Sequence, residues 1–184
     1  MKTWGVLTLS APGAARLAQH RRTLSACLDG LVAVPAAVRG VGAAPLRFDG
    51  ILGALVDGLS SVPNDAERIA LLDERALDSL GVEPVLEMIS WLDDDHAAVV
   101  RAAPVTDALK RVADDAVVGG VERAGLYVPQ PPHIIRRDAL DAALRGSTAL
   151  ARVNADPAGL LVAAGHAIRV VRDAGPPFTL MAAA

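Results

Sequence analysis

Apolar residues follow two patterns in this chain, and the patterns alternate along it. Short, mostly apolar runs of the kind found in buried parallel strands occupy residues 4–9, 69–73, 97–100 and 166–171. Apolar residues at helical spacing predict helices over residues 14–28, 51–59, 82–92, 136–144 and 159–165. Residues 31–41 fit either pattern. The alternation predicts an α/β fold with a largely parallel central sheet.

The middle of the chain has a different pattern. Two short β-prone runs, residues 109–112 and 117–121, flank the polar pair Asp114-Asp115. A Pro/Gln-rich bend follows at residues 129–132, and Arg136-Arg137-Asp138 opens a helix. On physical grounds this segment is a hairpin arm, followed by a loop and an amphipathic helix.

Size and composition set limits on the class of protein. The 184 residues suffice for one domain with its own core, so we expect a single domain over residues 1–184. No apolar run reaches the length of a membrane span, and a net charge of −3 with 3% aromatic residues argues against a nucleic-acid surface. The single cysteine, Cys27, excludes an internal disulfide and a cysteine-cluster metal site. The N-terminal apolar run is too short for a signal peptide, which predicts a cytoplasmic protein.

The segment from Pro104 to Leu140 carries a resemblance to a known family. It begins Pro104-Val105-Thr106-Asp107-Ala108-Leu109-Lys110 and later reads Gln130-Pro131-Pro132-His133-Ile134-Ile135. It resembles the 2-C-methyl-D-erythritol 4-phosphate cytidylyltransferases of the non-mevalonate isoprenoid pathway. In that family Pro-Val-x-Asp-Thr-x-Lys enters a projecting β-arm, and Gln-Thr-Pro-Gln-x-Phe follows the arm. The order and spacing of the pieces match, although several letters differ.

The resemblance implies a fold. We expect a Rossmann-like three-layer nucleotidyltransferase fold, with a mostly parallel sheet and a projecting β-arm over residues 107–130. Aligned to the family, residues 31–41 continue the first helical layer. A block of a few dozen residues is then missing before residue 47, which implies that outer strands are absent and that the first strand lies nearer an edge of the sheet.

The resemblance also implies a site and a reaction. In the family the phosphate oxygen of methylerythritol phosphate attacks the α-phosphorus of CTP, pyrophosphate leaves, and Mg²⁺ assists. Family dimers exchange their arms, so a homodimer formed through the arm is implied here. Carried over position by position, the catalytic residues are Arg16 and Arg22, the substrate-binding residues are Asp107, Lys110 and Gln130, and the metal-binding residues are Asp73 and Asp156.

Several positions depart from the family pattern in ways that are expected to weaken binding of a triphosphate. Pro12 and Ala14 replace glycines of a phosphate-binding loop, where proline lacks an N–H donor and alanine resists positive φ. Pro131 replaces a substrate-binding threonine, and Thr179 stands where the family has a lysine. His133, in place of a glutamine, has no partner at catalytic or metal-binding spacing, and we predict that it lies at the surface.

Each candidate also has a plainer interpretation. Asp73 fits a solvated residue at a strand end, the arginines fit an exposed helix, and the charges of the arm fit the rim of a hairpin. The acidic triplet Asp93-Asp94-Asp95 fits a solvated loop better than a cation site. Three hypotheses follow: a divergent cytidylyltransferase with an eroded site, a catalytically silent relative that acts as a binding or regulatory dimer, and an unrelated α/β interaction domain.

Overall fold

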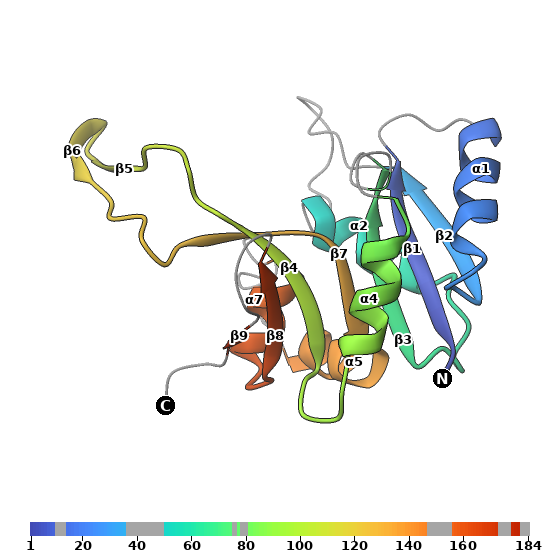
Figure 1. Cartoon of the computed structure of the whole chain (residues 1–184). Helices are drawn as coiled ribbons and strands as arrows, with labels where there is room; N and C mark the ends of the chain where they lie inside the picture. Colours follow the sequence, from blue (N-terminus) through green and yellow to red (C-terminus); the bar gives the residue numbers. More distant parts are fainter. Residues whose placement is uncertain are drawn as a thin grey trace.

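The chain forms one large sheet between helices, with a separate hairpin (Figure 1). The computed structural model describes residues 1–9, 14–35, 50–74, 77, 81–146, 156–172 and 178–180. The strands of the large sheet are β1 (Thr3–Leu9), β2 (Gly30–Pro35), β3 (Arg68–Asp73), β4 (Ala98–Pro104), β7 (Tyr127–Arg136), β8 (Ile168–Arg172) and β9 (Phe178–Leu180). The hairpin consists of β5 (Lys110–Ala113) and β6 (Ala116–Gly120). The helices are α1 (Ala14–Leu24), α2 (Gly50–Leu59), α4 (Glu83–Trp91), α5 (Arg137–Gly146) and α7 (Pro157–Ala163).

The seven-stranded sheet has the order β2-β1-β3-β7-β4-β8-β9. β1 pairs in parallel with β2 and β3, and β4 pairs in parallel with β8. β7 is antiparallel to both β3 and β4, and β9 is antiparallel to β8. All strands except β7 and β9 therefore run in one direction, and the expected mostly parallel sheet is confirmed.

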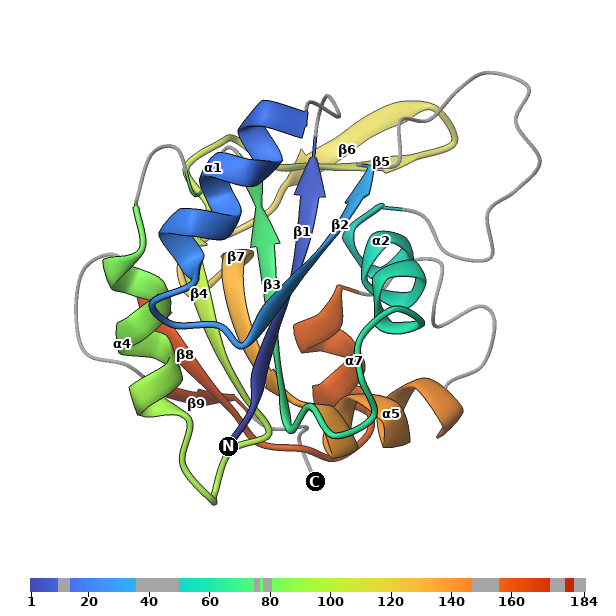
Figure 2. The same ribbon diagram turned by 90° about the vertical axis from the view of Figure 1, so that its right-hand side faces the viewer.

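Helices cover both faces of the sheet, which gives the expected three layers (Figure 2). On one face, α2, α5 and α7 place Leu55, Leu140 and Leu161 against strand residues that include Leu71 and Ile135, all of them buried. On the other face, α1 and α4 contribute side chains that include Leu24 and Met88, which pack with Leu7, Leu72 and Ile134. Within the described ranges, no helix is long and apolar enough to cross a membrane.

The expectation that residues 31–41 continue a helical layer was wrong for their first part. Residues 30–35 form β2, parallel to β1. The run Leu31-Val32-Ala33-Val34 is apolar and rich in β-branched side chains, which suits a strand. Gly30 is needed because a Cβ at this position would lie 2.5 Å from the ring of Trp4. Among the described residues, β2 is the edge of the sheet, so β1 lies one strand inside it.

A central strand replaces the loop predicted around residues 129–135. β7 runs through this segment, with Gln130 paired to Arg101 and His133 paired to Val100. The register shifts between these two pairs, because Pro131 and Pro132 form a bulge between them. The strand continues because Ile134 and Ile135, both fully buried, provide core contacts on the two faces of the sheet.

The hairpin predicted in the middle of the chain is confirmed. β5 and β6 are antiparallel and pair around Asp114 and Asp115, whose φ angles are 47° and 60°. Two consecutive positive φ angles are typical of the tight turns that match the twist of a hairpin. The hairpin extends away from the sheet, and all residues of both strands are exposed (Figure 1).

Candidate active site

Four predicted site residues lie at one edge of the sheet. The parallel strands β1, β3, β4 and β8 end at this carboxyl edge, and the antiparallel β7 begins there. The helices α1 and α7 also begin at this edge, because each leads back to a parallel strand. Open α/β sheets bind ligands outside the carboxyl ends of their strands. Arg16, Asp73, Gln130 and Asp156 are the predicted residues found here.

Arg16 forms an ion pair with a buried carboxylate. Arg16 lies in the first turn of α1, and its Nε is 2.9 Å from Oε1 of Glu74, directly after β3. The Glu74 side chain is 1% exposed, whereas that of Arg16 is 51% exposed. A carboxylate at this depth requires a charged or hydrogen-bonded partner. The buried carboxylate favours keeping Arg16 beside it, so this pair anchors α1 to the end of β3.

Asp73 is held by the neighbouring strand. It is the last residue of β3 and lies opposite Thr8 of β1. The buried Thr8 hydroxyl lies 3.1 Å from Asp73 Oδ2, as donor, and 3.2 Å from the carbonyl oxygen of Leu72. The Asp73 carboxylate is partly exposed, and its contact with Thr8 orients it at the carboxyl edge.

Asp156 has a clear structural role as the N-cap of α7. Its Oδ1 accepts hydrogen bonds from the backbone N–H groups of Ala158 at 2.8 Å and Gly159 at 3.0 Å. Pro157 occupies the first helical turn, where its missing N–H is not needed. Asp156 is therefore fixed at the start of α7 whether or not it also contacts a ligand.

The prediction that His133 lies at the surface was wrong. Its side chain is 1% exposed, because His133 follows the alternation of β7 and lies on the same face as the buried Ile135. Neither ring nitrogen has a hydrogen-bond partner within the described part of the chain. Burial lowers the pKa of His133 to about 4, although the Asp156 carboxylate and the backbone of Gln130 favour the charged form. His133 is therefore a neutral imidazole at pH 7, located near two predicted site residues.

Three other predicted residues lie away from this edge. Arg22 is exposed in the last turn of α1, about 9 Å along the helix from Arg16 at 1.5 Å per residue. Asp107 and Lys110 are exposed on the arm, and Lys110 lines a hollow of about 600 Å³ together with Arg123 at the base of the hairpin. Within one copy of the chain, β5, which begins at Lys110, lies far from α1, which contains Arg16 (Figure 1). The roles of these three residues stay predictions.

Some sequence differences from the family lie outside the described residues. These include Pro12 and the rest of the loop before α1, and the segment that precedes β9. Thr179 is part of β9, and Ala14 begins α1.

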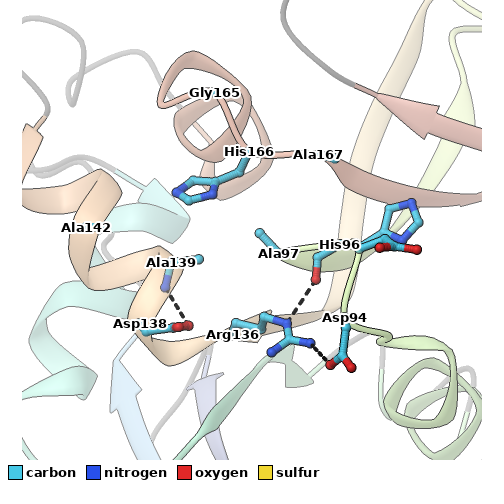
Figure 3. Close-up of a pocket in the computed structure, with 11 residues that line it drawn as sticks. Asp94, His96, Ala97, Arg136, Asp138, Ala139, Ala142, Gly165, His166 and Ala167 are labelled. Atoms are coloured by element: carbon cyan, nitrogen blue, oxygen red, sulfur yellow. Dashed lines mark hydrogen bonds and ion pairs between the residues drawn. The ribbon is translucent and has the colours of Figure 1, made fainter.

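A second hollow lies at the opposite edge of the sheet, at the amino ends of β4 and β8 (Figure 3). It has a volume of about 440 Å³, and Arg136 is one of the residues that line it. Arg136 donates to the carbonyl oxygens of His96 at 3.1 Å and Asp93 at 2.7 Å, and to Asp94 Oδ1 at 2.8 Å. These hydrogen bonds hold the loop before β4 in place, so the role of Arg136 is structural.

The acidic triplet is more strongly anchored than the predicted solvated loop. Asp93 interacts with His96 Nδ1 at 2.6 Å and with the guanidinium of Arg169. The hydrogen bond from His96, followed by the charges of His96 and Arg169, lowers the pKa of Asp93. Asp94 is almost fully exposed apart from its ion pair with Arg136. Asp93 and Asp94 therefore stabilise the turn before β4 through contacts with basic side chains.

The carboxylates at the carboxyl edge suit a magnesium ion held jointly with a nucleotide. The described residues contain no group of three or more His, Cys, Asp or Glu side chains that could hold a metal by themselves. Mg²⁺ is usually bound by one or two carboxylates together with substrate phosphates and water. Asp73 and Asp156 are carboxylates at this edge, so they could hold a Mg²⁺ ion only together with a substrate and water.

The layers, the strand order and the projecting hairpin define a Rossmann-like nucleotidyltransferase fold. Two solved structures of similar fold are 4-diphosphocytidyl-2C-methyl-D-erythritol synthase from Anaerococcus prevotii, with a TM-score of 0.66 at 17% identity, and 2-C-methyl-D-erythritol 4-phosphate cytidylyltransferase from Thermus thermophilus, with a TM-score of 0.64 at 17% identity. The first alignment covers 93% of this chain and 88% of the other, and the second covers 94% and 89%.

Sequence comparison extends this likeness from the fold to the family. The profile of the 2-C-methyl-D-erythritol 4-phosphate cytidylyltransferase family matches residues 52–179. A relative with this name from Ectopseudomonas mendocina is 32% identical over 126 residues, or 68% of this chain and 53% of the relative. Another, from Bordetella parapertussis, is 32% identical over 130 residues, or 71% and 55%. The chain therefore belongs to the 2-C-methyl-D-erythritol 4-phosphate cytidylyltransferase family.

The match has limits in both chains. This chain spans about half the length of the curated relatives that it matches. The profile includes Asp73, the arm, Gln130 and Asp156, but it begins after Arg16 and Arg22. Glu74 was missed as a site residue because it is a departure from the family pattern. The available signal was its position, since an acid directly after a buried strand lies at the carboxyl edge.

Proposed function

We propose that this protein binds CTP at the carboxyl edge and transfers the cytidylyl group to methylerythritol phosphate with low turnover. The observation that carries the proposal is the gathering of Arg16, Asp73, Gln130 and Asp156 at this edge in a chain that belongs to the cytidylyltransferase family. The expected reaction joins the phosphate oxygen of the sugar substrate to the α-phosphorus of CTP and releases pyrophosphate.

Each residue has a role in this proposal. Transfer at phosphorus depends on positioning the reactants and on cations where negative charge develops. Arg16 supplies a fixed positive charge beside the triphosphate, and Gln130 contacts the substrate. Asp73 and Asp156 hold Mg²⁺, which neutralises charge on the triphosphate when it is bound. Arg22 supports the nucleotide from the side of α1, which is the least direct of these assignments.

The arm completes the site from a second copy of the chain. Asp107 and Lys110 are exposed on a hairpin that extends away from the sheet (Figure 1). Their assigned contact with the sugar phosphate therefore requires the arm of one copy to reach the carboxyl edge of another. A homodimer formed through the arms provides this arrangement, and the exposed valines of the hairpin support it.

Low turnover follows from the changed residues. Loss of one cationic clamp lowers the rate of phosphoryl-transfer enzymes by roughly 10³–10⁵-fold. Thr179 stands in place of the family lysine, and no lysine follows Lys110 in the chain. Pro131 cannot provide the hydroxyl of the threonine that it replaces.

Two assays test the proposal. CTP with Mg²⁺ is expected to raise the thermal midpoint, because a ligand that binds only the native state stabilises it by about 2.7 kcal/mol at 100 times its Kd. Adding methylerythritol phosphate is expected to release pyrophosphate slowly, and the Asp73→Asn variant is expected to release none. Absence of both CTP binding and pyrophosphate release would exclude the proposed activity.

A catalytically silent binding dimer is the second candidate. The changed lysine and threonine positions favour it, because they affect catalysis directly while the fold and the arm are retained. CTP binding without pyrophosphate release, in a protein that self-associates, would support this candidate. Measurable turnover that depends on Asp73 would exclude it.

A further inference from the structure

We propose that Glu74 is a positioning residue that fixes Arg16 at the nucleotide site. This inference rests on the proposed binding of CTP. The family pattern has an alanine at this place in the Asp-Ala-Ala-Arg segment, so Glu74 departs from that pattern. The observation that carries it is the ion pair of 2.9 Å between Arg16 Nε and the buried Glu74 carboxylate.

The depth of Glu74 makes the ion pair persistent. Its side chain is 1% exposed, so its charge depends on groups within the protein for compensation. A phosphate that drew Arg16 away would break this ion pair at a buried carboxylate, which costs free energy that the new contact would have to offset. We therefore expect Arg16 to stay on Glu74 when CTP binds.

Arg16 can hold Glu74 and face a ligand at the same time. Its side chain is 51% exposed, and the contact to Glu74 is made through Nε. The guanidinium group is a planar fork with donors on all three nitrogens, so an ion pair at Nε restricts where the two terminal nitrogens can lie. A lysine could not do both, because its single ammonium has no fixed plane.

The neighbouring strand end makes this position suitable for a phosphate. Glu74 directly follows Asp73, whose carboxylate is oriented by Thr8. Asp73, the last residue of β3, lies on the same face of the sheet as Leu71, since side chains alternate along an extended strand, and α7 covers this face. Arg16 belongs to α1, which covers the other face. Arg16 therefore lies on the α1 side of the strand end, while Asp73 and the cation that it would hold lie on the α7 side. A triphosphate across the strand end would contact Arg16 on one side and the cation on the other.

Binding of CTP with Mg²⁺ to matched variants tests the inference. Glu74→Gln keeps the size and the acceptor oxygen but removes the charge. We expect it to raise the Kd for CTP at least tenfold, as Arg16→Ala does, and the double variant to bind no more weakly than the worse single variant. Glu87→Gln makes the same change on the exposed side of α4 and is expected to leave the Kd unchanged.

The thermal midpoint without ligand separates positioning from stability. A purely structural role lowers this midpoint but leaves the Kd of the folded protein unchanged. If Glu74→Gln does not fold, Glu74→Asp serves as the second variant. It keeps the negative charge but moves it away from Arg16 by one methylene, so it is also expected to raise the Kd for CTP. Wild-type affinity or tighter binding in the folded Glu74 variants would overturn the inference, as would a normal Kd for Arg16→Ala. Absence of CTP binding by the wild type would instead overturn the proposed function.

Discussion

His133 is the clearest case of a residue whose surroundings determine its chemistry. Its pKa is about 4 in the folded chain, against an ordinary value of 6.5, because its side chain is buried. Between these two pH values the unfolded chain binds more protons than the folded one, so the free energy of unfolding rises with pH. Burial of the neutral His133 imidazole therefore costs nothing in protonation above pH 6.5. The free energy of unfolding falls as the pH drops from 6.5 toward 4.

We predict that acid destabilises the fold through His133. Between pH 6.5 and pH 4, the free energy of unfolding should fall by about 3 kcal/mol from this group alone. Urea unfolding at several pH values measures this change. His133→Leu removes the titration and should flatten the profile in this window. Equal slopes for the wild type and His133→Leu would contradict the assignment.

Asp156 allows a structural role to be separated from a ligand role. The side chain caps α7 through Oδ1, and an asparagine can make the same two hydrogen bonds. Asp156→Ala should therefore lower the free energy of unfolding by about 1 kcal/mol, while Asp156→Asn should lower it by only a few tenths. Chemical denaturation measures both. If Asp156 also holds Mg²⁺, Asp156→Asn weakens CTP binding despite its normal stability, and unchanged binding would leave it as a cap only.

Individual site residues could be predicted from the sequence only where they keep the family pattern. Asp73, Gln130 and Asp156 were predicted in this way, and the structure places them at one edge of the sheet, while their roles in binding stay predictions. The burial of Glu74 and His133 could not be predicted from the residue types alone. The burial of Glu74 depends on an arginine 58 positions earlier in the chain, and the burial of His133 depends on its place in a central strand.

At the scale of elements, the helices and most strands follow from apolar spacing, but β7 does not. Prolines at 129, 131 and 132 predict a loop, because proline cannot donate to a ladder of strand hydrogen bonds. The bulge between Gln130 and His133 accommodates two of them, and pairing with both β3 and β4 stabilises the remainder. At this strand, pairing with β3 and β4 therefore outweighs the preference of the prolines for a loop. These contacts come from distant parts of the chain, so a short stretch of sequence does not reveal them.

α7 provides a test of how strongly one short helix contributes to the fold. It has seven residues, so its stability must come from its cap and its packing rather than from its own hydrogen bonds. Leu161 is fully buried against the sheet, whereas the adjacent Val162 is partly exposed. Leu161→Ala should lower the free energy of unfolding by about 2–5 kcal/mol, and Val162→Ala by clearly less. Similar urea midpoints for the two variants would show that α7 is not part of the cooperative core.

At the scale of the whole molecule, the hairpin of β5 and β6 lacks a surface on which to bury its apolar side chains. Two-stranded hairpins are marginally stable in water, and Val112, Val117 and Val118 are 59%, 67% and 56% exposed. Val112 and Val117 lie opposite each other in the hairpin, so they form one apolar surface. An exposed apolar surface of this kind indicates a partner. In the proposed dimer, the partner is a second copy of the chain.

We therefore predict that wild-type protein is a dimer of 18.9 kDa chains and that acidic residues on this surface dissociate it. Val112→Asp with Val117→Asp should give a folded monomer by light scattering, because both side chains are exposed and contribute little to the core of one chain. Leu86→Asp makes the same kind of change on α4 and should remain dimeric. The monomer should retain CTP binding through Arg16 but lose the contribution of Lys110 to the sugar phosphate. A monomeric wild type, or a double variant that remains dimeric, would show that the arm does not join two copies.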